Sequence, residues 1–342
     1  MLLRGWAGAL LLLAACSNPN STASVAPSAH PPIVSAPTVA EPVKLEQPPA
    51  EPAKTEPQAL DYKQVVVRQL LLRCSDKATQ GGAIVCRAPA DSTLALDGKP
   101  VAKADRDGIA VIGLTRDQKS PAVISMDIKT QDGAFPTTFS VPVAERHDTV
   151  TKFEMECAKI APQSEADKKK ADISWTKKQK ALKKFNDPVA PVAFEGPVTL
   201  QGVVYSSSFG ATRTYVPKTK DCEPTTSVHN GTDIAVGKGT EIHAPMAGTV
   251  ILADPDLFFE GGCVFLDLGR GLVSVTMHMS RIDVKAGQVV KQGDLLGLSG
   301  ATGRVTGPHL HWAIKYRNVF SEDRGTDIWL DPMLVMKLKA PE

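Results

Sequence analysis

The sequence predicts a mainly β protein, in which a small N-terminal β-sandwich-like domain and a larger C-terminal β domain are joined by a helix. Gly and Pro each account for 26 of the 342 residues, which suits a turn-rich β protein and is too many for a helical bundle. Aromatic residues make up only 5%, so the cores depend on Val, Leu, Ile and Ala. The formal net charge of +2 lacks the strong basic excess of a dedicated nucleic-acid-binding protein.

Residues 1–15 are expected to be a lipoprotein signal peptide. Arg4 precedes an apolar run of about the length of a signal peptide's core, too short to span a bilayer. The run ends in Leu-Ala-Ala-Cys at 13–16, which resembles the lipobox of bacterial lipoproteins, so Cys16 is the expected lipidation site. The alternative is an ordinary signal peptide with a chance cysteine. Several acyl chains on one cysteine anchor a protein stably. Ser17, which is not Asp, favours the outer membrane by analogy with enterobacterial sorting.

Residues 16–60 are predicted to form a disordered, proline-rich tether. Between 17 and 60 there are ten prolines and no Phe, Trp or Tyr. Such a segment cannot bury enough apolar area to offset its chain entropy. At about 3.1 Å per residue its reach is at most roughly 130 Å, enough to lift a domain well away from a membrane.

Residues 62–158 are predicted to form the β-sandwich-like accessory domain. Short runs rich in β-formers occur at 65–67, 94–96, 109–112, 123–126 and 139–141. Asp-Gly pairs, a strong hairpin signal, fall between these runs at 97–98, 107–108 and 132–133. Nothing in this range is predicted to be catalytic.

Residues 164–186 are predicted to form a lysine-rich connector helix. Ser164 and Asp167 have the spacing of an N-terminal capping pair. Eight lysines lie between Lys168 and Lys184, with only sparse apolar residues among them. This pattern is typical of a solvated helix, and the alternative is electrostatic attraction to an anionic wall polymer or membrane surface.

Five cysteines follow the lipidation site, and an exported protein meets an oxidising compartment in which disulfides form. Their spacings fit no zinc-ribbon pattern. Cys222 and Cys263 are expected to pair because both lie in the C-terminal domain, and Cys74 with Cys86 could staple a hairpin. An odd number leaves one thiol free, and Cys157 is the candidate.

Five of the seven histidines lie between 229 and 311. Residues i and i+2 of a strand face the same side, so His309 and His311 are expected to project into one cleft. His229 and Asp233 are four residues apart, about 13 Å in an extended strand, which is too far for one metal ion. Asn-Gly at 230–231 opposes a helix and permits a bend that aims both side chains at one point.

Such a cluster fits a zinc hydrolase. These enzymes use three nitrogen or oxygen ligands and leave a fourth position for water. The ion lowers the pKa of that water and polarises the scissile carbonyl. Together with His278, the C-terminal region offers four histidines and one aspartate, enough for three ligands and two acid–base groups. The spacing alone leaves open which residues take which role.

Residues from about 200 to 335 resemble the M23 metallopeptidases, also called lysostaphin-type or LytM-domain endopeptidases. The matching motifs occur in family order: Phe-Gly at 209–210 with Arg213, His-x-Gly-x-Asp at 229–233, Gly-Thr at 239–240 with Ala-Pro at 244–245, Gly-x-Val at 248–250, His-x-Ser at 278–280, Gly-x-x-Val-x-x-Gly at 287–293, and Thr-Gly-x-x-x-Gly-Pro-His-Leu-His-Trp at 302–312. The resemblance implies an antiparallel β-sheet M23 domain over 190–342. One departure is Asp-Leu-Gly at 267–269, where the family usually has Asp-His-Gly.

The resemblance also implies residue roles. His229, Asp233 and His311 correspond to the ligands of one zinc ion per chain. His278 and His309 correspond to the two catalytic histidines, of which one acts as general base and both stabilise an oxyanion.

The implied function is a zinc-dependent endopeptidase that hydrolyses peptide stems or cross-links of peptidoglycan, at the periplasmic face of the outer membrane of a Gram-negative bacterium. The alternative is a non-enzymatic LytM protein that activates a cell-wall amidase. Such activators typically lack one or more metal or catalytic residues, and here all five are present. A lipoyl-type carrier is disfavoured because no lysine marks an exposed hairpin tip.

Expected partners are peptidoglycan, the membrane and an amidase or regulatory protein, but no nucleic acid. Adjacency permits the accessory domain or the lysine-rich helix to cover the cleft.

Overall fold

The computed structural model describes residues 71–130 and 133–341, which all belong to one unit of the chain, residues 59–342. The predicted signal peptide over 1–15, the lipidation site Cys16 and the predicted tether over 16–60 lie outside the described residues. Among the helices described, none has the length and apolar character required to cross a membrane.

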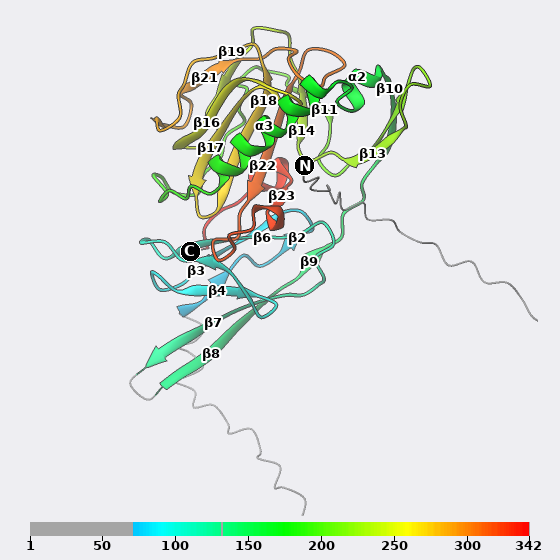
Figure 1. Ribbon diagram of the computed structural model, residues 1–342. Coiled ribbons are helices and arrows are strands. Elements are labelled where there is room, and N and C mark those ends of the chain that lie inside the picture. The colour runs from blue at the N-terminus through cyan, green and yellow to red at the C-terminus, as the bar shows by residue number, and fades with distance from the viewer. Residues whose placement is uncertain (1–70, 131–132, 342) are drawn as a thin grey trace, which may run out of the picture. The chain divides into compact units, whose positions relative to one another are not determined.

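The first part of the described chain consists of two small sheets around one apolar core (Figure 1). Their strand orders are β1-β3-β6 and β5-β4-β7-β8, and a short parallel pair joins β2 to β9. The bounds are β1 Arg73–Cys74, β2 Ala78–Thr79, β3 Ala83–Arg87, β4 Thr93–Leu96, β5 Lys99–Lys103, β6 Ile109–Gly113, β7 Ala122–Thr130, β8 Gly133–Val141 and β9 Val143–Ala144. Asp97 and Gly98 both have positive φ, as the turn of a tight hairpin requires, and they join β4 to β5. A disulfide joins Cys74 to Cys86, which face each other across β1 and β3.

Helix α3, Glu165–Leu182, is the longest helix of the described residues, and it lies against strand β16, Gly248–Leu257 (Figure 1). Its first turn is stabilised by a reciprocal capping box between Ser164 and Asp167. Lys177 donates to Asp254 over 2.6 Å, and Lys178 pairs with Glu260. Lys177 and Lys178 therefore link the helix to the sheet through ion pairs, whereas a purely solvated helix would have no such contacts.

The C-terminal part is built on an eight-stranded sheet in which β11-β14-β22-β18-β17-β16-β20 are neighbours and β23 pairs with β22. Two three-stranded sheets accompany it, with orders β10-β12-β13 and β15-β21-β19. The bounds are β10 Val150–Met155, α2 Cys157–Ile160, β11 Val204–Ser207, β12 Thr212–Pro217, β13 Thr225–Val228, β14 Thr232–Ala235, β15 Glu241–His243, β16 Gly248–Leu257, β17 Gly261–Gly269, β18 Leu272–Met279, β19 Arg281–Ile282, β20 Val289–Val290, β21 Leu295–Leu298, β22 Leu310–Tyr316, η1 Arg324–Thr326, β23 Ile328–Leu330 and α4 Pro332–Val335. Every residue of β17 and β22 is buried, which places these two strands at the centre of the core.

A buried ion pair ties the end of α3 to this sheet. Arg317 and Asp267 have side chains with no exposed area, and Nη2 lies 2.6 Å from Oδ1. The other oxygen of Asp267 accepts from the backbone and side-chain nitrogens of Asn186, just beyond the helix. Leu268, where the M23 family usually has a histidine, is 1% exposed and belongs to the apolar core.

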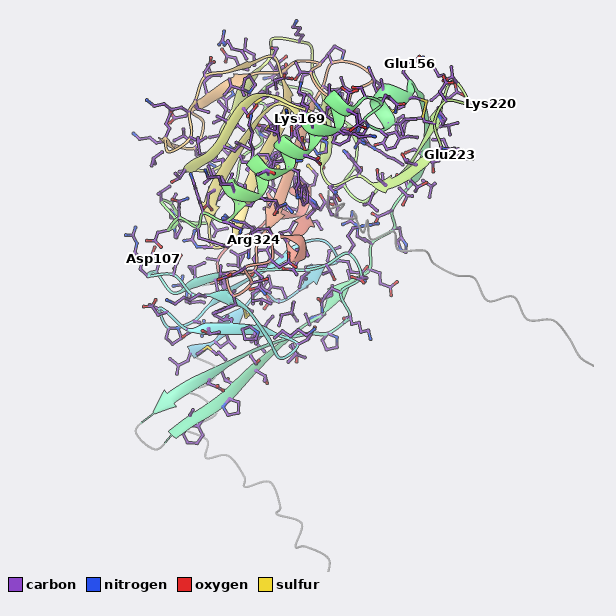
Figure 2. The ribbon with its side chains drawn as sticks, viewed as in Figure 1. Asp107, Glu156, Lys169, Lys220, Glu223 and Arg324 are labelled. Atoms are coloured by element: carbon purple, nitrogen blue, oxygen red, sulfur yellow. A yellow bond between two sulfur atoms is a disulfide. The ribbon has the colours of Figure 1, made fainter. Side chains whose placement is uncertain are left out.

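The disulfide expected between Cys222 and Cys263 is not present. Cys222 is bonded to Cys157 instead, and Cys263 is a free, buried thiol on β17. The reason is that β10 pairs in parallel with β12. This pairing places Cys157, just after β10, beside Cys222 in the turn between β12 and β13. Figure 2 shows Glu156 of this segment near Lys220 and Glu223 of that turn. The segment 150–158, expected in the accessory domain, thus pairs with the C-terminal part.

Candidate metal and catalytic site

The site is centred on two adjacent antiparallel strands, β14 and β22. Asp233 and His311 are directly opposite each other in their register. Leu310, between the two histidines of the motif, is fully buried in the core, so His309 and His311 face the opposite side of the strand. A side chain on Gly231 would lie 2.5 Å from His311 Nε2, so the bend before β14 needs glycine.

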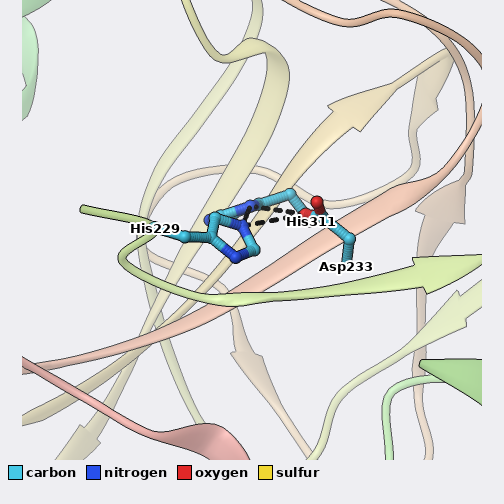
Figure 3. A group of neighbouring side chains, drawn as sticks. All are labelled: His229, Asp233 and His311. Atoms are coloured by element: carbon cyan, nitrogen blue, oxygen red, sulfur yellow. Dashed lines mark hydrogen bonds and ion pairs between the residues drawn. The ribbon is translucent and has the colours of Figure 1, made fainter. Parts of the chain in front are cut away.

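Three side chains converge on one point (Figure 3). His229 Nε2 lies 3.1 Å from Asp233 Oδ1 and 3.0 Å from His311 Nδ1. The third edge of the triangle, from His311 Nδ1 to Asp233 Oδ1, is 2.9 Å. All three residues are buried. The kinked segment 229–233 therefore brings His229 and Asp233 together.

The proton positions favour a cation at this point. His229 Nδ1 lies 2.8 Å from the carbonyl oxygen of Ser208, so Nδ1 carries the hydrogen and Nε2 presents a lone pair to the other two groups. Burial of Asp233 opposes its ionisation, but its close contacts with His229 and His311 outweigh burial and hold the pKa of this carboxyl well below its usual range. An ionised oxygen and ring nitrogens thus meet in a buried position.

The spacing suits a tetrahedral zinc ion. Zinc bonds of about 2.0–2.1 Å place the ligand atoms of a tetrahedron roughly 3.3 Å apart. The three distances between ligand atoms are within a few tenths of an ångström of that value. Two imidazoles and one carboxylate form a donor set that zinc hydrolases use. His229, Asp233 and His311 could therefore hold this ion.

Two further histidines face the same cleft. The rings of His278 and His309 have centroids 4.9 Å apart, and that of His278 is 6.0 Å from that of His311. His278 Nδ1 donates to the carbonyl of Thr302 over 2.9 Å, and His309 Nδ1 donates to that of Gly307 over 2.9 Å. Both rings in their neutral form therefore keep Nε2 as a proton acceptor.

His278 is held in an unusual state. Its φ of 65° lies in the left-handed region, which non-glycine residues rarely adopt outside functional sites. Its backbone N–H is fixed by a 2.9 Å hydrogen bond to the carbonyl of Glu260. Burial and, to a lesser extent, the neighbouring His311 and His309 lower the pKa of His278 to about 3. The ring is thus neutral at physiological pH.

The five side chains line a cleft of about 580 Å³. One wall comes from Thr151, Phe153 and Met155 of β10, and another from the loop 304–308. Within the described part of the chain, no residue before Thr151 lines this cleft, and neither does any residue of α3. The accessory domain and the lysine-rich helix therefore leave it uncovered in this structure.

Part of the chain that contains this site matches a known protein family. Residues 227–322 match the model of peptidase family M23, and this range contains all five site residues. The chain contains an M23 peptidase domain. A solved structure titled a putative peptidase M23 from Pseudomonas aeruginosa is 29% identical, with a TM-score of 0.51, and the match covers 79% of this chain and 98% of that one.

Two named relatives match about a third of this chain. The peptidoglycan DD-endopeptidase ShyA of Vibrio cholerae is 40% identical over 112 residues, which is 33% of this chain and 25% of that protein. The cell division protein DipM of Caulobacter vibrioides is 32% identical over 108 residues, which is 32% of this chain and 17% of that protein. This chain thus spans about a quarter or less of the length of these relatives.

Arg213 contacts the carboxylate of Asp233, which its place in a sequence motif does not reveal. Its Nη2 lies 2.6 Å from Asp233 Oδ2 and 2.6 Å from Ser207 Oγ. Asp233 therefore directs one oxygen to the histidines and the other to a guanidinium. Arg213 comes from β12 and Asp233 from β14, which are not neighbouring strands of one sheet, so only the fold shows this contact.

A second set of arginines holds the loop before Ala211. Arg146 donates to the carbonyl of Phe209 over 3.1 Å, and Arg116 of the accessory domain donates to that of Gly210 over 3.1 Å. Asp148 pairs with both arginines. Burial of Asp148 raises its pKa, but the hydrogen bonds from the two arginines outweigh burial and lower it. These carbonyls follow directly after the one that orients His229.

Proposed function

We propose that the chain is a zinc-dependent endopeptidase that cleaves peptide bonds in the stems or cross-links of peptidoglycan. The convergence of His229, Asp233 and His311 beside His278 and His309, whose Nδ1 atoms are both held by backbone carbonyls, carries this proposal. An M23 domain with named peptidoglycan DD-endopeptidases among its relatives supports the substrate class.

The hydrogen-bond partners of the histidines support a role for each residue. His229, Asp233 and His311 would hold the zinc ion, which supplies Lewis acidity and lowers the pKa of water. His278 and His309 are positioned by the carbonyls of Thr302 and Gly307. Each Nε2 can accept a proton from the attacking water and return it to the leaving amine, or donate to the developing oxyanion.

Arg213 supports the proposed site through its contact with Asp233. The arginine orients the carboxylate through its contact with Oδ2, and both side chains are largely buried. The loop 304–308 and β10 form walls of the cleft. A substrate peptide enters between these walls.

Purified sacculi test the proposal. The zinc-loaded chain should release muropeptides that have been cut within the peptide, and a chelator should stop the release. The contrary outcome is no cleavage by zinc-loaded protein together with stimulation of a cell-wall amidase, which would assign the chain the activator role.

The location is proposed from the sequence alone. We propose that Cys16 carries a lipid anchor at the periplasmic face of the outer membrane and that the tether lets the M23 domain reach the wall. Labelling with a fatty-acid analogue should mark the protein, and Cys16→Ser should abolish labelling. Membrane fractionation of the wild-type chain would then distinguish outer from inner membrane.

A further inference from the structure

Arg304 differs from the other charged residues that line the cleft. The others are Arg213, Asp233 and Glu260. Arg213 pairs with Asp233, and Glu260 pairs with Lys178 of α3. Within the described ranges, the guanidinium of Arg304 forms no ion pair or hydrogen bond with protein. Its positive charge is therefore the uncompensated one on the cleft lining.

Two aromatic rings hold this guanidinium. Its Cζ lies 4.8 Å from the ring centroid of Phe259 and 5.3 Å from that of Tyr215. These distances are typical of cation–π contacts, which position the charge without using its N–H donors. Both rings also line the cleft. The donors of Arg304 thus remain available to a ligand.

The backbone around Arg304 is equally well fixed. Its N–H donates to the carbonyl of Phe259 over 2.8 Å. A Cβ on Gly303 would lie 2.4 Å from the nitrogen of Gly261, so this loop packs backbone to backbone against the β16–β17 hairpin. Lys159 donates to the carbonyl of Val305 over 2.7 Å, which ties the other side of the loop to α2. Arg304 is therefore presented from a rigid position.

We propose that Arg304 binds a free carboxylate of the substrate peptide and so selects acidic peptides for hydrolysis. A planar guanidinium binds a carboxylate through two parallel hydrogen bonds, and such charge-assisted pairs are stronger than neutral ones. Arg304 lines the same cleft as His229 and His309, so the recognised carboxylate lies near the bond that is cut. This inference rests on the proposed peptidase function and names its substrate class. The carboxylate can be a side chain or a chain terminus.

A matched pair of peptides tests it. The protein is the full chain with Cys16→Ser, loaded with zinc. Its two substrates are a wall-derived peptide that contains the scissile bond and a free carboxylate, and the same peptide with a carboxamide in place of that carboxylate. Amidating the terminus and the side chain separately identifies which carboxylate is read. The wild-type residue at 304 should favour the acid by about 10- to 100-fold in kcat/KM, mostly through KM.

Variants attribute the preference to one side chain. Arg304→Gln should reduce the ratio of kcat/KM for the acid peptide over the amide peptide to about one. Arg304→Lys should keep part of the preference, because it retains the charge but loses the bidentate geometry. Arg106→Gln, the same change at an exposed position of the accessory domain, should keep the full preference. Zinc affinity should be equal in all of these proteins.

Two results would overturn the inference: equal use of acid and amide by the wild-type residue, or an undiminished preference in Arg304→Gln. Calorimetric binding of both peptides separates this failure from failure of the proposed function. If neither peptide is cleaved but the acid binds more tightly and Arg304→Gln abolishes the difference, carboxylate recognition stands and the peptidase proposal falls. If both are cleaved at equal rates and bind equally, the peptidase proposal stands and Arg304 is not the selector.

Discussion

Arg213 and Asp233 form an ion pair in which Nη2 of the arginine lies 2.6 Å from Oδ2 of the aspartate. The other oxygen, Oδ1, is the one that faces both ligand histidines. The arginine thus orients the carboxylate and fixes which of its oxygens faces the histidines. Groups that orient metal ligands from behind contribute strongly to affinity.

Arg213→Leu should lower zinc affinity by about 10- to 100-fold, because Asp233 loses its orienting partner. Competition with a chromophoric chelator measures this directly. Arg213→Lys should recover part of the affinity, and Arg106→Leu serves as a control for loss of an arginine elsewhere. Unchanged affinity in Arg213→Leu would show that Asp233 is held without it.

His309→Ala and His311→Ala should separate catalysis from metal binding. His309→Ala should keep zinc and lose cleavage by about 10²- to 10⁴-fold, the usual contribution of a positioned acid–base group. His311→Ala should lose both. His147→Ala, at an exposed position, should lose neither. Full activity in His309→Ala would refute the role assigned to that ring.

The disulfide between Cys157 and Cys222 should stabilise the β10 wall of the cleft. It closes a loop with a sequence separation of 65 residues, for which the chain-entropy model gives about 4 kcal/mol. Replacing both cysteines with Ser should therefore lower the melting temperature by about 10 °C. Non-reducing peptide mapping checks the connectivity, and a peptide joining Cys222 to Cys263 would contradict the structure.

Lys315 should make stability depend on pH in the alkaline range. Burial lowers its pKa from 10.5 to about 8, so between these values the unfolded chain binds more protons and stability rises with pH. The shift corresponds to an increase of up to about 3 kcal/mol between pH 8 and pH 10.5. Urea unfolding of the wild-type chain and Lys315→Met should show this rise as a difference between the two. A constant difference across that range would refute the shifted pKa.

Motifs in the sequence were enough to predict the M23 domain and the β-rich accessory domain. The histidine spacing predicted one cleft for His309 and His311 because strand alternation is a local rule. The capping box at Ser164 is equally local, and the structure contains it. Local rules of this kind can be read from a single segment.

Contacts between distant segments could not be predicted in this way. The pairing of β10 with β12 joins residues about sixty positions apart, and the expectation for Cys222 failed because of it. The ion pair of Arg213 and the aromatic contacts of Arg304 likewise depend on tertiary packing. The sequence motifs contain both arginines but do not indicate which groups either side chain contacts.

The central claim is that one zinc ion at His229, Asp233 and His311 makes this chain a peptidase. Titration of the metal-free chain with zinc, with muropeptide release from sacculi measured at each step by mass spectrometry, tests it most directly. The cleavage rate should rise in proportion to zinc up to one equivalent per chain and then level off. Cleavage by the metal-free chain, or no cleavage at one bound equivalent, would contradict the account.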